Sequence, residues 1–383
     1  MPYTLITEVG MMRAQRAWVS AAAAVAVIVA GTAASAAPAE HGADRKTLQE
    51  RLDHVVDVGA VGALAEVRDE HGVWRGTSGV AELGTTRAVP ARGHFRVGSI
   101  SKTFVATVVL QLVEGGELGL DDTVESWLPG VLPAGEGMTV RQLLNHTSGV
   151  YDYVRTLPMP PGQEFVANRW RTWTPDELVR RAVANPPSVD PPGSRYSYSN
   201  TGYLLLGRII EKAAGRSYAE EIEQRIIEPL RLRGTSVPGT SPRVPQPRPR
   251  AYLPVEPGGT AHPTDYTEMN PSLFGTAGDM ISTTRDLNRF VAALLDGSLV
   301  SDHLLAEMKK PGAEGATYGL GLDWYDTACG VRVYGNDGDA LAYQAWSYAT
   351  EDGRRQATVG LTSNRPADPA DAVHALLDEA FCD

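Results

Sequence analysis

The chain contains 383 residues, 43% of them hydrophobic, and carries a formal net charge of −11 at pH 7. This length is sufficient for a large buried core in one or two domains. The acidic balance argues against nucleic acid as a partner, because nucleic-acid binding relies on clustered Lys and Arg, and otherwise favours solubility.

Residues 1–36 have the features of an export signal. A basic lead that begins at Arg13 precedes an apolar run over residues 17–30, and residues 34–36 (Ala-Ser-Ala) form a small-residue cleavage site. The apolar run is too short to cross a bilayer comfortably. We therefore expect a secreted protein without stable membrane insertion; an N-terminal membrane anchor is the alternative. Two methionines just before the basic lead are alternative start positions.

Hydrophobic periodicity and turn residues predict strands near both ends of the chain and helices between them. Helices are expected at residues 44–58, 99–114, 140–144, 175–184, 203–214, 282–295 and 369–381. Strands are expected at residues 62–68, 73–80, 318–325, 330–334, 342–350 and 357–362. Residues 234–272, rich in Pro and Gly, are predicted to form a long ordered excursion over the surface and are a candidate substrate-facing segment.

This order of elements predicts an α+β fold. An antiparallel sheet would be built from both chain ends and flanked by helices, with an inserted all-helical lobe. We expect one domain over residues 37–383, with a sheet lobe at about 37–95 and 275–383 and a helical lobe at about 96–274. A cleft between the lobes is the natural ligand site. We expect a monomer.

The first catalytic candidate is Ser99 with Lys102, the only Ser-x-x-Lys pair in the chain. Residues three apart on a helix share a face, and the helix that follows is apolar round most of its circumference, which predicts burial. Burial lowers the pKa of a lysine, so Lys102 can be neutral and take the proton of Ser99, aided by the positive helix N-terminus. The alternative is a chance pair with a solvated lysine.

A second candidate is the loop that carries Tyr198 and Asn200. The tyrosine can relay a proton as a phenol or phenolate, and the amide of Asn200 can hydrogen-bond both Lys102 and a substrate amide. Tyr-x-Asn is a weak signal alone, because residues 334–336 match it as well. The alternative is a turn with a packed tyrosine.

A third candidate is the stretch Asn336, Asp337, Gly338 and Asp339 at the end of a predicted strand. Gly338 lets another backbone approach closely, and the backbone amide of Asp339 could form an oxyanion hole with that of Ser99. The alternative is an Asn-Asp-Gly hairpin turn.

His146 is a further candidate for a catalytic base. It lies in Asn-His-Thr-Ser-Gly, a cluster typical of caps and turns, which favours a structural hydrogen bond. The sequence also lacks a Gly-x-Ser-x-Gly elbow, so a Ser-His-Asp triad is disfavoured.

The two cysteines, Cys329 and Cys382, both lie near the carboxyl end. In an exported protein such a pair predicts a disulfide, here between the last helix and a strand. No His or Cys lies at ligand spacing around either cysteine, so we expect no metal, and nothing in the sequence calls for a cofactor.

Taken in this order, the three candidate motifs resemble those of the penicillin-recognising serine hydrolases. The branch is the one with Tyr-x-Asn: class C β-lactamases, secreted DD-carboxypeptidases, D-aminopeptidases and related esterases. The resemblance implies a serine β-lactamase/DD-peptidase-like fold, with Ser99 acylated, Lys102 as the base, Tyr198 as the proton relay to the leaving group and Asn200 as the substrate-amide ligand. It extends over residues 95–104, 119–122, 143–149, 198–207, 282–287 and 318–322. Residues 318–322 and the cysteine pair look closest to the secreted actinomycete-type D-alanyl-D-alanine carboxypeptidases.

The third motif departs from the family pattern. Family members usually have His or Lys, then Thr or Ser, then Gly, where this chain has Asn336, Asp337 and Gly338, followed by Asp339. The position of an Arg that grips the substrate carboxylate in the carboxypeptidases is Asp323 here. A cationic substrate-binding site has thus become one with up to three carboxylates, which should repel a C-terminal carboxylate.

These observations predict a secreted serine hydrolase that forms an acyl-enzyme on Ser99, most like a D-alanyl-D-alanine carboxypeptidase. Its partner would be a small-molecule or peptide substrate: a cell-wall peptide, an ester or an amide. One alternative is an esterase or a D-amino-acid amidase or aminopeptidase whose leaving side bears no carboxylate. A non-catalytic cell-wall or β-lactam-binding homologue is another, and acyl transfer to an amine is a third.

Overall fold

A computed structural model describes residues 44–133, 137–160, 162–255, 262–363 and 368–382. The expected export signal at residues 1–36 lies outside the described residues. Within them, no helix combines the length and the apolar character needed to span a bilayer.

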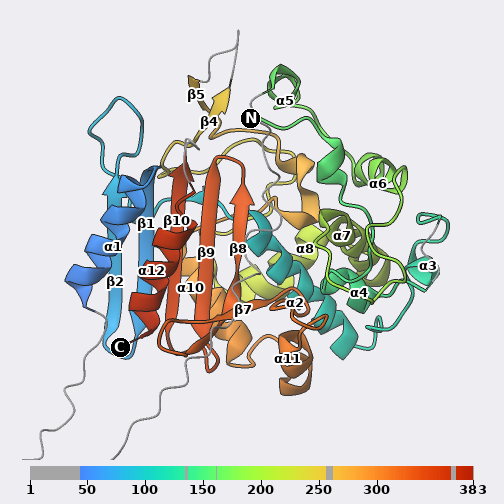
Figure 1. The fold of residues 1–383 in the computed structure, drawn as a ribbon. Helices are drawn as coiled ribbons and strands as arrows, with labels where there is room; N and C mark the ends of the chain where they lie inside the picture. Colours follow the sequence, from blue (N-terminus) through green and yellow to red (C-terminus); the bar gives the residue numbers. More distant parts are fainter. Residues whose placement is uncertain (1–43, 134–136, 161, 256–261, 364–367, 383) are drawn as a thin grey trace, which may run out of the picture. The chain divides into compact units, whose positions relative to one another are not determined.

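The centre of the fold is a six-stranded antiparallel sheet (Figure 1) with the strand order β2-β1-β10-β9-β8-β7. Strand β1 is hydrogen-bonded to β10, with Ala63 opposite Leu361, so the two ends of the chain build one sheet as predicted. The strands are β1 (Ala60–Asp69), β2 (Gly72–Gly79), β7 (Asp323–Asp326), β8 (Arg332–Ala340), β9 (Tyr343–Thr350) and β10 (Gln356–Ser363).

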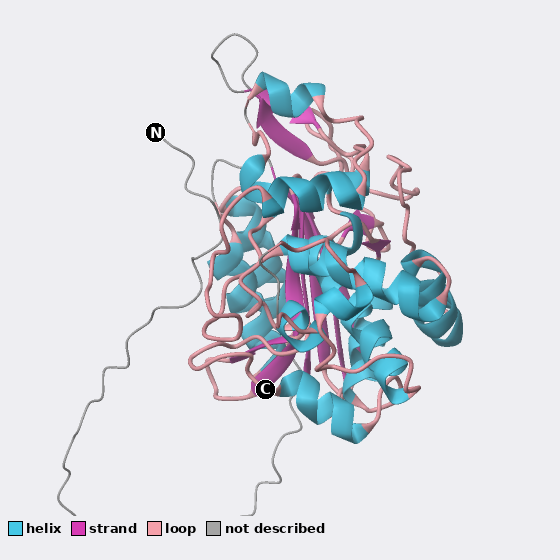
Figure 2. Ribbon diagram, turned by 90° about the vertical axis from the view of Figure 1, so that its right-hand side faces the viewer, coloured by secondary structure: helices cyan, strands magenta, loops and turns pink. Residues whose placement is uncertain are grey.

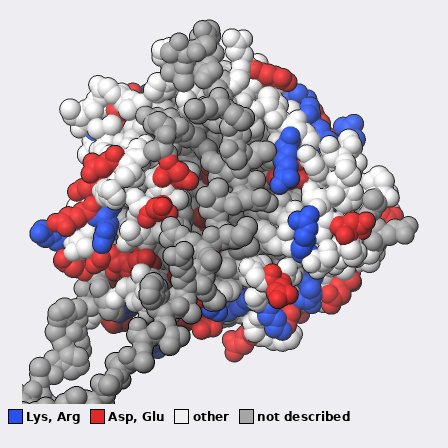
Figure 3. All heavy atoms as spheres, viewed as in Figure 1, with Lys and Arg blue, Asp and Glu red and all other residues white. Residues whose placement is uncertain are grey.

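Helices cover both faces of this sheet (Figure 2). Helices α1 (Arg45–Asp57) and α12 (Ala370–Phe381) pack on one face, where their leucines and valines form a core with Trp346 and Val359. Helix α10 (Thr284–Leu295) packs on the other face, where Asn288 donates to the carbonyl of Glu66. Acidic and basic side chains are interspersed on the visible part of the surface in Figure 3.

Helix α2 (Ser101–Glu114) is the central helix that the sequence predicted. Every residue from Ser101 to Leu110 is buried, because apolar side chains occupy nearly its whole circumference. The ring of Phe104 stacks on Phe290 of α10 with 3.6 Å between centroids, which joins the helical part to the sheet. The other helices of the described chain are α3 (Val124–Trp127), α4 (Val140–Leu144), α5 (Gln163–Ala167), α6 (Pro175–Val183), α7 (Asn200–Ala214), α8 (Tyr218–Ile222), α9 (Glu228–Leu230) and α11 (Asp302–Lys309).

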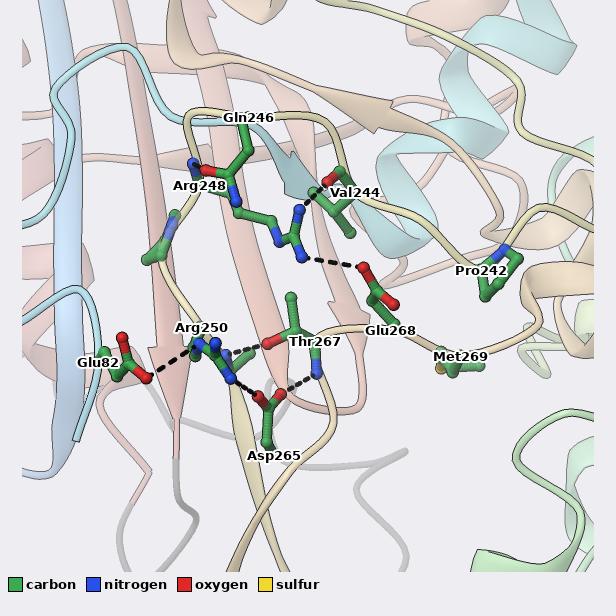
Figure 4. Close-up of polar contacts among 12 residues, drawn as sticks. Glu82, Pro242, Val244, Gln246, Arg248, Arg250, Asp265, Thr267, Glu268 and Met269 are labelled. Atoms are coloured by element: carbon green, nitrogen blue, oxygen red, sulfur yellow. Dashed lines mark hydrogen bonds and ion pairs between the residues drawn. The ribbon is translucent and has the colours of Figure 1, made fainter. Parts of the chain in front are cut away.

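The part expected to be all-helical, at about residues 96–274, also contains a short strand pair: β4 (Tyr252–Val255) pairs with β5 (His262–Asp265). At the expected boundary between the lobes, β3 (Phe95–Arg96) pairs with β6 (Ile281–Ser282). The β4–β5 pair is the one outside the expectation. It lies within the Pro- and Gly-rich excursion, whose polar contacts are drawn in Figure 4.

Arginines fasten this excursion to the rest of the protein. Two ion pairs lie within the excursion: Arg248 with Glu268 at 2.9 Å and Arg250 with Asp265 at 2.6 Å (Figure 4). Two contacts join it to the rest of the protein: Arg250 pairs with Glu82 at 3.2 Å, and the nearly fully buried Arg96 of β3 donates to the backbone carbonyls of Pro242 and Met269, at 2.7 and 3.1 Å. The described parts of the excursion, residues 234–255 and 262–272, are called the strap below; they are held near the strand that leads to Ser99.

Two predicted boundaries differ in ways that matter for the site. The strand expected at residues 318–325 begins only at Asp323, because the preceding residues form a loop against α2, where Thr103 donates to the carbonyl of Gly321 at 2.8 Å. The helix expected at residues 203–214 begins at Asn200, which makes Asn200 its first residue.

The third motif is not a hairpin turn. Strand β8 was expected to end at Tyr334 but continues to Ala340, and Asn336 to Gly338 pair with Ser347 to Ala345 of β9. The chain reverses only between Ala340 and Tyr343. The turn interpretation is therefore wrong, because pairing with β9 overrides the local turn preference of Asn-Asp-Gly.

The predicted disulfide is present. Cys329 and Cys382 are bonded, with 5.6 Å between their Cα atoms, and they are separated by 53 residues in the sequence. The bond joins the β7–β8 connection to the end of α12.

Replacing both cysteines with serine should lower the free energy of unfolding by about 2–4 kcal/mol, because the crosslink restricts a long loop in the unfolded chain. Urea denaturation followed by circular dichroism measures this. Dithiothreitol should lower the urea midpoint of the native protein and leave that of the double serine variant unchanged. An unaffected native midpoint would contradict the assigned stabilising role.

Candidate active site

Ser99 lies in a short 3-10 turn, η1 (Gly98–Ile100), between β3 and α2. Gly98 has φ +53°, and a Cβ there would lie 2.6 Å from the backbone carbon of Asp339. A Cβ on Gly338 would lie 2.7 Å from the backbone nitrogen of Ser99. Both positions require glycine because the backbone of β8 presses directly against the turn. The predicted close approach at Gly338 is confirmed, and it brings the backbones of Ser99 and Asp339 together.

The side chain of Lys102 lies against that of Ser99, as the spacing predicted. The Lys102 Nζ is 2.9 Å from Ser99 Oγ, 2.9 Å from Asn200 Oδ1 and 2.7 Å from the backbone carbonyl oxygen of Ala277. The lysine is fully buried. This burial lowers its pKa to about 7, although the carboxylates of Asp152 and Asp337 oppose the shift. A lysine with this pKa is substantially neutral at neutral pH and can accept a proton.

Tyr198 completes the group from the loop before α7. Its hydroxyl is 2.6 Å from Ser99 Oγ, and Lys102 Nζ lies 4.8 Å from the centre of its ring. Desolvation by the surrounding protein, with the neighbouring Tyr318, raises the pKa of Tyr198 well above its ordinary value. The sequence left open a phenol or a phenolate; this shift favours the phenol, which can donate a proton but is a poor base beside Lys102.

Asp152 is a site residue that sequence reasoning missed. Asn200 donates from Nδ2 to Asp152 Oδ2 at 3.1 Å, which orients the amide so that its oxygen accepts from Lys102. Asp152 itself is buried, and this burial raises its pKa. No motif spacing connects Asp152 to the other residues. The carbonyl of Ala277 was missed too, because a backbone acceptor leaves no signal in a sequence.

His146 lies beneath the tyrosine loop and does not act as a base toward Ser99. Its Nδ1 accepts a hydrogen bond from the backbone amide of Ser199 at 3.2 Å, and its ring is 4.3 Å from that of Tyr198. Burial, with a smaller contribution from Lys102, lowers its pKa well below the ordinary value. The histidine is therefore neutral and positions the loop, in agreement with the structural interpretation.

Asn336 occupies the side of β8 that faces α2. Its buried amide donates to Thr103 Oγ1 at 3.2 Å and to the hydroxyl of Tyr318 at 3.4 Å. The weak contact to Ser99, at 3.5 Å, is to the backbone oxygen and not to Oγ. The expected substrate-binding side chain is thus engaged with the protein behind the nucleophile.

The three aspartates of the expected substrate-binding site share the opposite face of the sheet. Side chains alternate along a strand, so Asp337 and Asp339 point away from the Asn336 side. Asp323 pairs with Gly335, two residues before Asp337, and therefore lies on this same face. Its carboxylate accepts from Thr317 at 2.8 Å.

The electrostatics of these aspartates reflect their crowding. Burial, and next the charge of Asp337, raise the pKa of Asp323 to about 7. Asp337 keeps an exposed side chain, but protein surrounds it on most sides; the resulting desolvation and the charge of Asp339 raise its pKa too. Among the described residues no cluster of His, Cys, Asp and Glu has the arrangement of a metal site.

Chemically, this arrangement offers a hydroxyl between a phenol and an amine that is neutral in a substantial fraction of molecules at neutral pH. Residues 45–380 match the family model described as Beta-lactamase. The chain belongs to the beta-lactamase family. The resemblance to the penicillin-recognising serine hydrolases is thereby confirmed, and with it the predicted fold class.

The chain is similar both to penicillin-binding proteins and to amidases. Penicillin-binding protein 4 of Amycolatopsis lactamdurans is 31% identical over 68% of this chain and 66% of its own length, so the chain spans about two thirds of that relative. The structure of a D-stereospecific amidohydrolase from Streptomyces sp. is 39% identical, with a TM-score of 0.80 over 88% of this chain and 99% of the other. The D-amino acid amidase of Ochrobactrum anthropi SV3, complexed with L-phenylalanine amide, is 29% identical, with a TM-score of 0.77 over 88% and 97%. This chain is thus a beta-lactamase-fold serine hydrolase related to both groups.

The pKa of Lys102 should appear in the reactivity of Ser99. We expect the rate of labelling by a small neutral fluorophosphonate to rise with pH through about 7, as the lysine loses its proton. Asp152→Asn should move this limb to lower pH by roughly one unit, because the carboxylate that stabilises the charged lysine is removed. Labelling rates from pH 5 to 9 measure this.

Asp302→Asn, which removes an exposed carboxylate in the first turn of α11, is the control and should leave the profile unchanged. An equal shift in both variants, or none in Asp152→Asn, would contradict the electrostatic assignment.

Proposed function

We propose that this protein hydrolyses amides or esters of D-aminoacyl groups through an acyl-enzyme on Ser99. The observation that carries the proposal is the hydrogen-bonded group of Ser99, Lys102 and Tyr198, in which Oγ lies 2.9 Å from the amine and 2.6 Å from the phenol. The 39% identity with a D-stereospecific amidohydrolase supports the D configuration of the acyl group.

In the first half-reaction, Ser99 Oγ bonds to the substrate carbonyl carbon and its proton passes to the neutral Nζ of Lys102. The carbonyl oxygen becomes negative, and the backbone amides of Ser99 and Asp339 are the proposed donors that stabilise it. The proton then moves through the hydroxyl of Tyr198 to the leaving nitrogen or oxygen as that bond breaks. Water releases the acyl group by the same steps in reverse, which restores Ser99.

Asn200 is the proposed ligand of the substrate amide, held in place by Asp152. Because Asn200 Oδ1 already accepts from Lys102, the amide links the base to the substrate side of the site. Loss of this link would misplace the lysine as well as the substrate.

The aspartates support a leaving side without a carboxylate. A substrate carboxylate near Asp323 and Asp337 would face like charges, and one close repulsion costs about 1–4 kcal/mol between water-like and surface-like dielectric values. An amide, an ester or an amine avoids that cost. Burial, the largest cause of the raised pKa of both aspartates, would also disfavour the negative charge of a substrate carboxylate at this place, which supports the proposal.

A D-alanyl-D-alanine carboxypeptidase is the second candidate function. It is favoured by the 31% identity with a penicillin-binding protein. It would require the free carboxylate of the leaving D-alanine to bind beside Asp323 and Asp337. Secretion, expected from residues 1–36, remains part of either proposal.

A matched pair of substrates separates the two candidates: a peptide ending in D-alanyl-D-alanine as the free acid, and its C-terminal amide. We expect kcat/KM to be at least about tenfold higher for the amide, from the repulsion given above. Asp323→Asn should reduce this preference and Asp323→Arg combined with Asn336→His should reduce it further. Asp326→Asn, an exposed aspartate on the same strand, is the control and should leave it unchanged.

Ser99→Ala should abolish turnover of both substrates, and mass spectrometry after a fluorophosphonate or a penicillin should place an adduct on Ser99. A clear preference of the native enzyme for the free acid would favour the carboxypeptidase. A native protein that forms no Ser99 adduct and turns over neither substrate would instead be a non-catalytic binding module.

A further inference from the structure

An apolar pocket has one wall close to the turn that carries Ser99: a Cβ on Gly278 would lie 3.3 Å from the Cβ of Phe274, which lines the pocket, and 3.5 Å from the backbone carbon of Gly98. Its empty volume, including the part open to solvent, is about 510 Å³. Residues from four separated segments line it, among them Val154, Leu157, Phe165, Trp173, Phe274 and Leu341.

One wall of the pocket belongs to the same chain segment as the carbonyl of Ala277, which accepts a hydrogen bond from Lys102. Leu273 and Phe274 line the pocket and keep part of their surface exposed, unlike the fully packed core. The carbonyl of Phe274 accepts from the amide of Ala277 at 3.0 Å, and the carbonyl of Ala277 accepts from Lys102 at 2.7 Å. The pocket wall therefore begins three residues from a direct contact of the lysine.

A second wall adjoins the Asn200 side of the site. Asp152, which binds the amide of Asn200, immediately precedes the turn η2 (Tyr153–Thr156), and Val154 of this turn lines the pocket. The hydroxyl of Tyr153 donates to the carbonyl of Leu273 at 2.6 Å, which ties this wall to the first.

The end of β8 supplies the third wall. Leu341, which lines the pocket, follows the proposed oxyanion donor Asp339 by two residues, and its amide donates to Asp339 Oδ1 at 2.7 Å. The pocket is thus bounded by extensions of both β8 and the Asn200–Asp152 pair. An acyl group with its carbonyl carbon at Ser99 Oγ would lie between these two elements, and its side chain would then extend toward the pocket.

The remaining wall is held by contacts within the protein. The ring of Tyr266, from the strap, stacks on Phe165 with 5.2 Å between centroids. The amide of Trp173 donates to Ser272 Oγ at 2.9 Å, and Asn270 donates to Thr172 Oγ1 at 2.9 Å. Two polar residues that also line the pocket have partners of their own: Arg169 donates from Nε to the carbonyl of Glu268 at 2.7 Å, and Asn168 donates to the carbonyl of Glu164 at 3.0 Å. The other lining side chains are mainly rings and aliphatic chains, which suit an apolar group.

We propose that this pocket binds a large apolar side chain, aromatic or branched aliphatic, on the acyl half of the substrate. This inference rests on the proposed function and adds the class of acyl group. The two halves of the substrate then meet opposite environments, with aspartates on the leaving side and apolar side chains on the acyl side. Such a contrast also sets the direction in which a substrate binds.

The test compares D-phenylalanine amide, D-leucine amide and D-alanine amide, which share one leaving group. For the native enzyme, kcat/KM should be at least about tenfold higher for the two large substrates, the scale expected for added methylene groups in an apolar pocket. Val154→Phe fills the pocket and should lower the ratio of D-phenylalanine amide to D-alanine amide at least about tenfold. Leu157→Trp is a second filling variant in case the first does not fold.

Val58→Phe makes the same change at a half-buried valine that follows α1, and it should leave the ratio unchanged. Equal native rates for all three amides, or equal ratios in the native enzyme and both folded filling variants, would overturn the pocket assignment while the hydrolase proposal stands. If the native enzyme turns over none of the amides and Ser99 forms no fluorophosphonate adduct, both proposals fail.

Discussion

The burial of one amine, that of Lys102, is the constraint on which the site depends. A lysine enclosed by protein is costly to keep charged, because desolvation of an ammonium ion exceeds what neutral hydrogen-bond acceptors return. Among the described residues, the hydrogen-bond partners of Nζ are a hydroxyl, an amide oxygen and a backbone carbonyl. The carboxylate of Asp152 is hydrogen-bonded to Asn200, and its charge only partly opposes the lowering of the lysine pKa by burial. This arrangement holds the pKa near 7, where a direct ion pair would raise it.

The geometry around this amine requires direct backbone contact between the turn that carries Ser99 and strand β8 of the sheet. Gly98 and Gly338 make that contact possible, since a side chain on either would overlap the opposite backbone. The same contact places the amide of Ser99 beside β8. The strap, held by Arg96 and by the Arg250–Glu82 ion pair, lies against the strand that enters this turn. The turn that carries Ser99, strand β8 and the strap, which are distant in the sequence, therefore come together in one place. The hydroxyl of Ser99 lies there.

The surroundings of the hydroxyl divide into two chemically different sides. Aspartates on one face of β7 and β8 oppose negative charge, whereas rings and aliphatic chains from four segments form the pocket beyond Leu341. Both features arise from particular side chains, and proteins that share one fold can differ in such side chains.

The sequence alone determined those features that depend on residues close together in the chain. The three-residue spacing of Ser99 and Lys102, the apolar circumference of α2 and the alternating strands all follow from local periodicity, which a sequence displays directly. The cysteine pair and the order of the motifs were equally readable. Only the tertiary structure decided that Asn336 to Gly338 continue a strand, because pairing with β9 outweighs local turn preference. It alone revealed Asp152, the carbonyl of Ala277 and the apolar pocket. Asp152 is separated from Asn200 by 48 positions and Ala277 from Lys102 by 175, and contacts between segments so far apart in the chain leave no periodic pattern in the sequence.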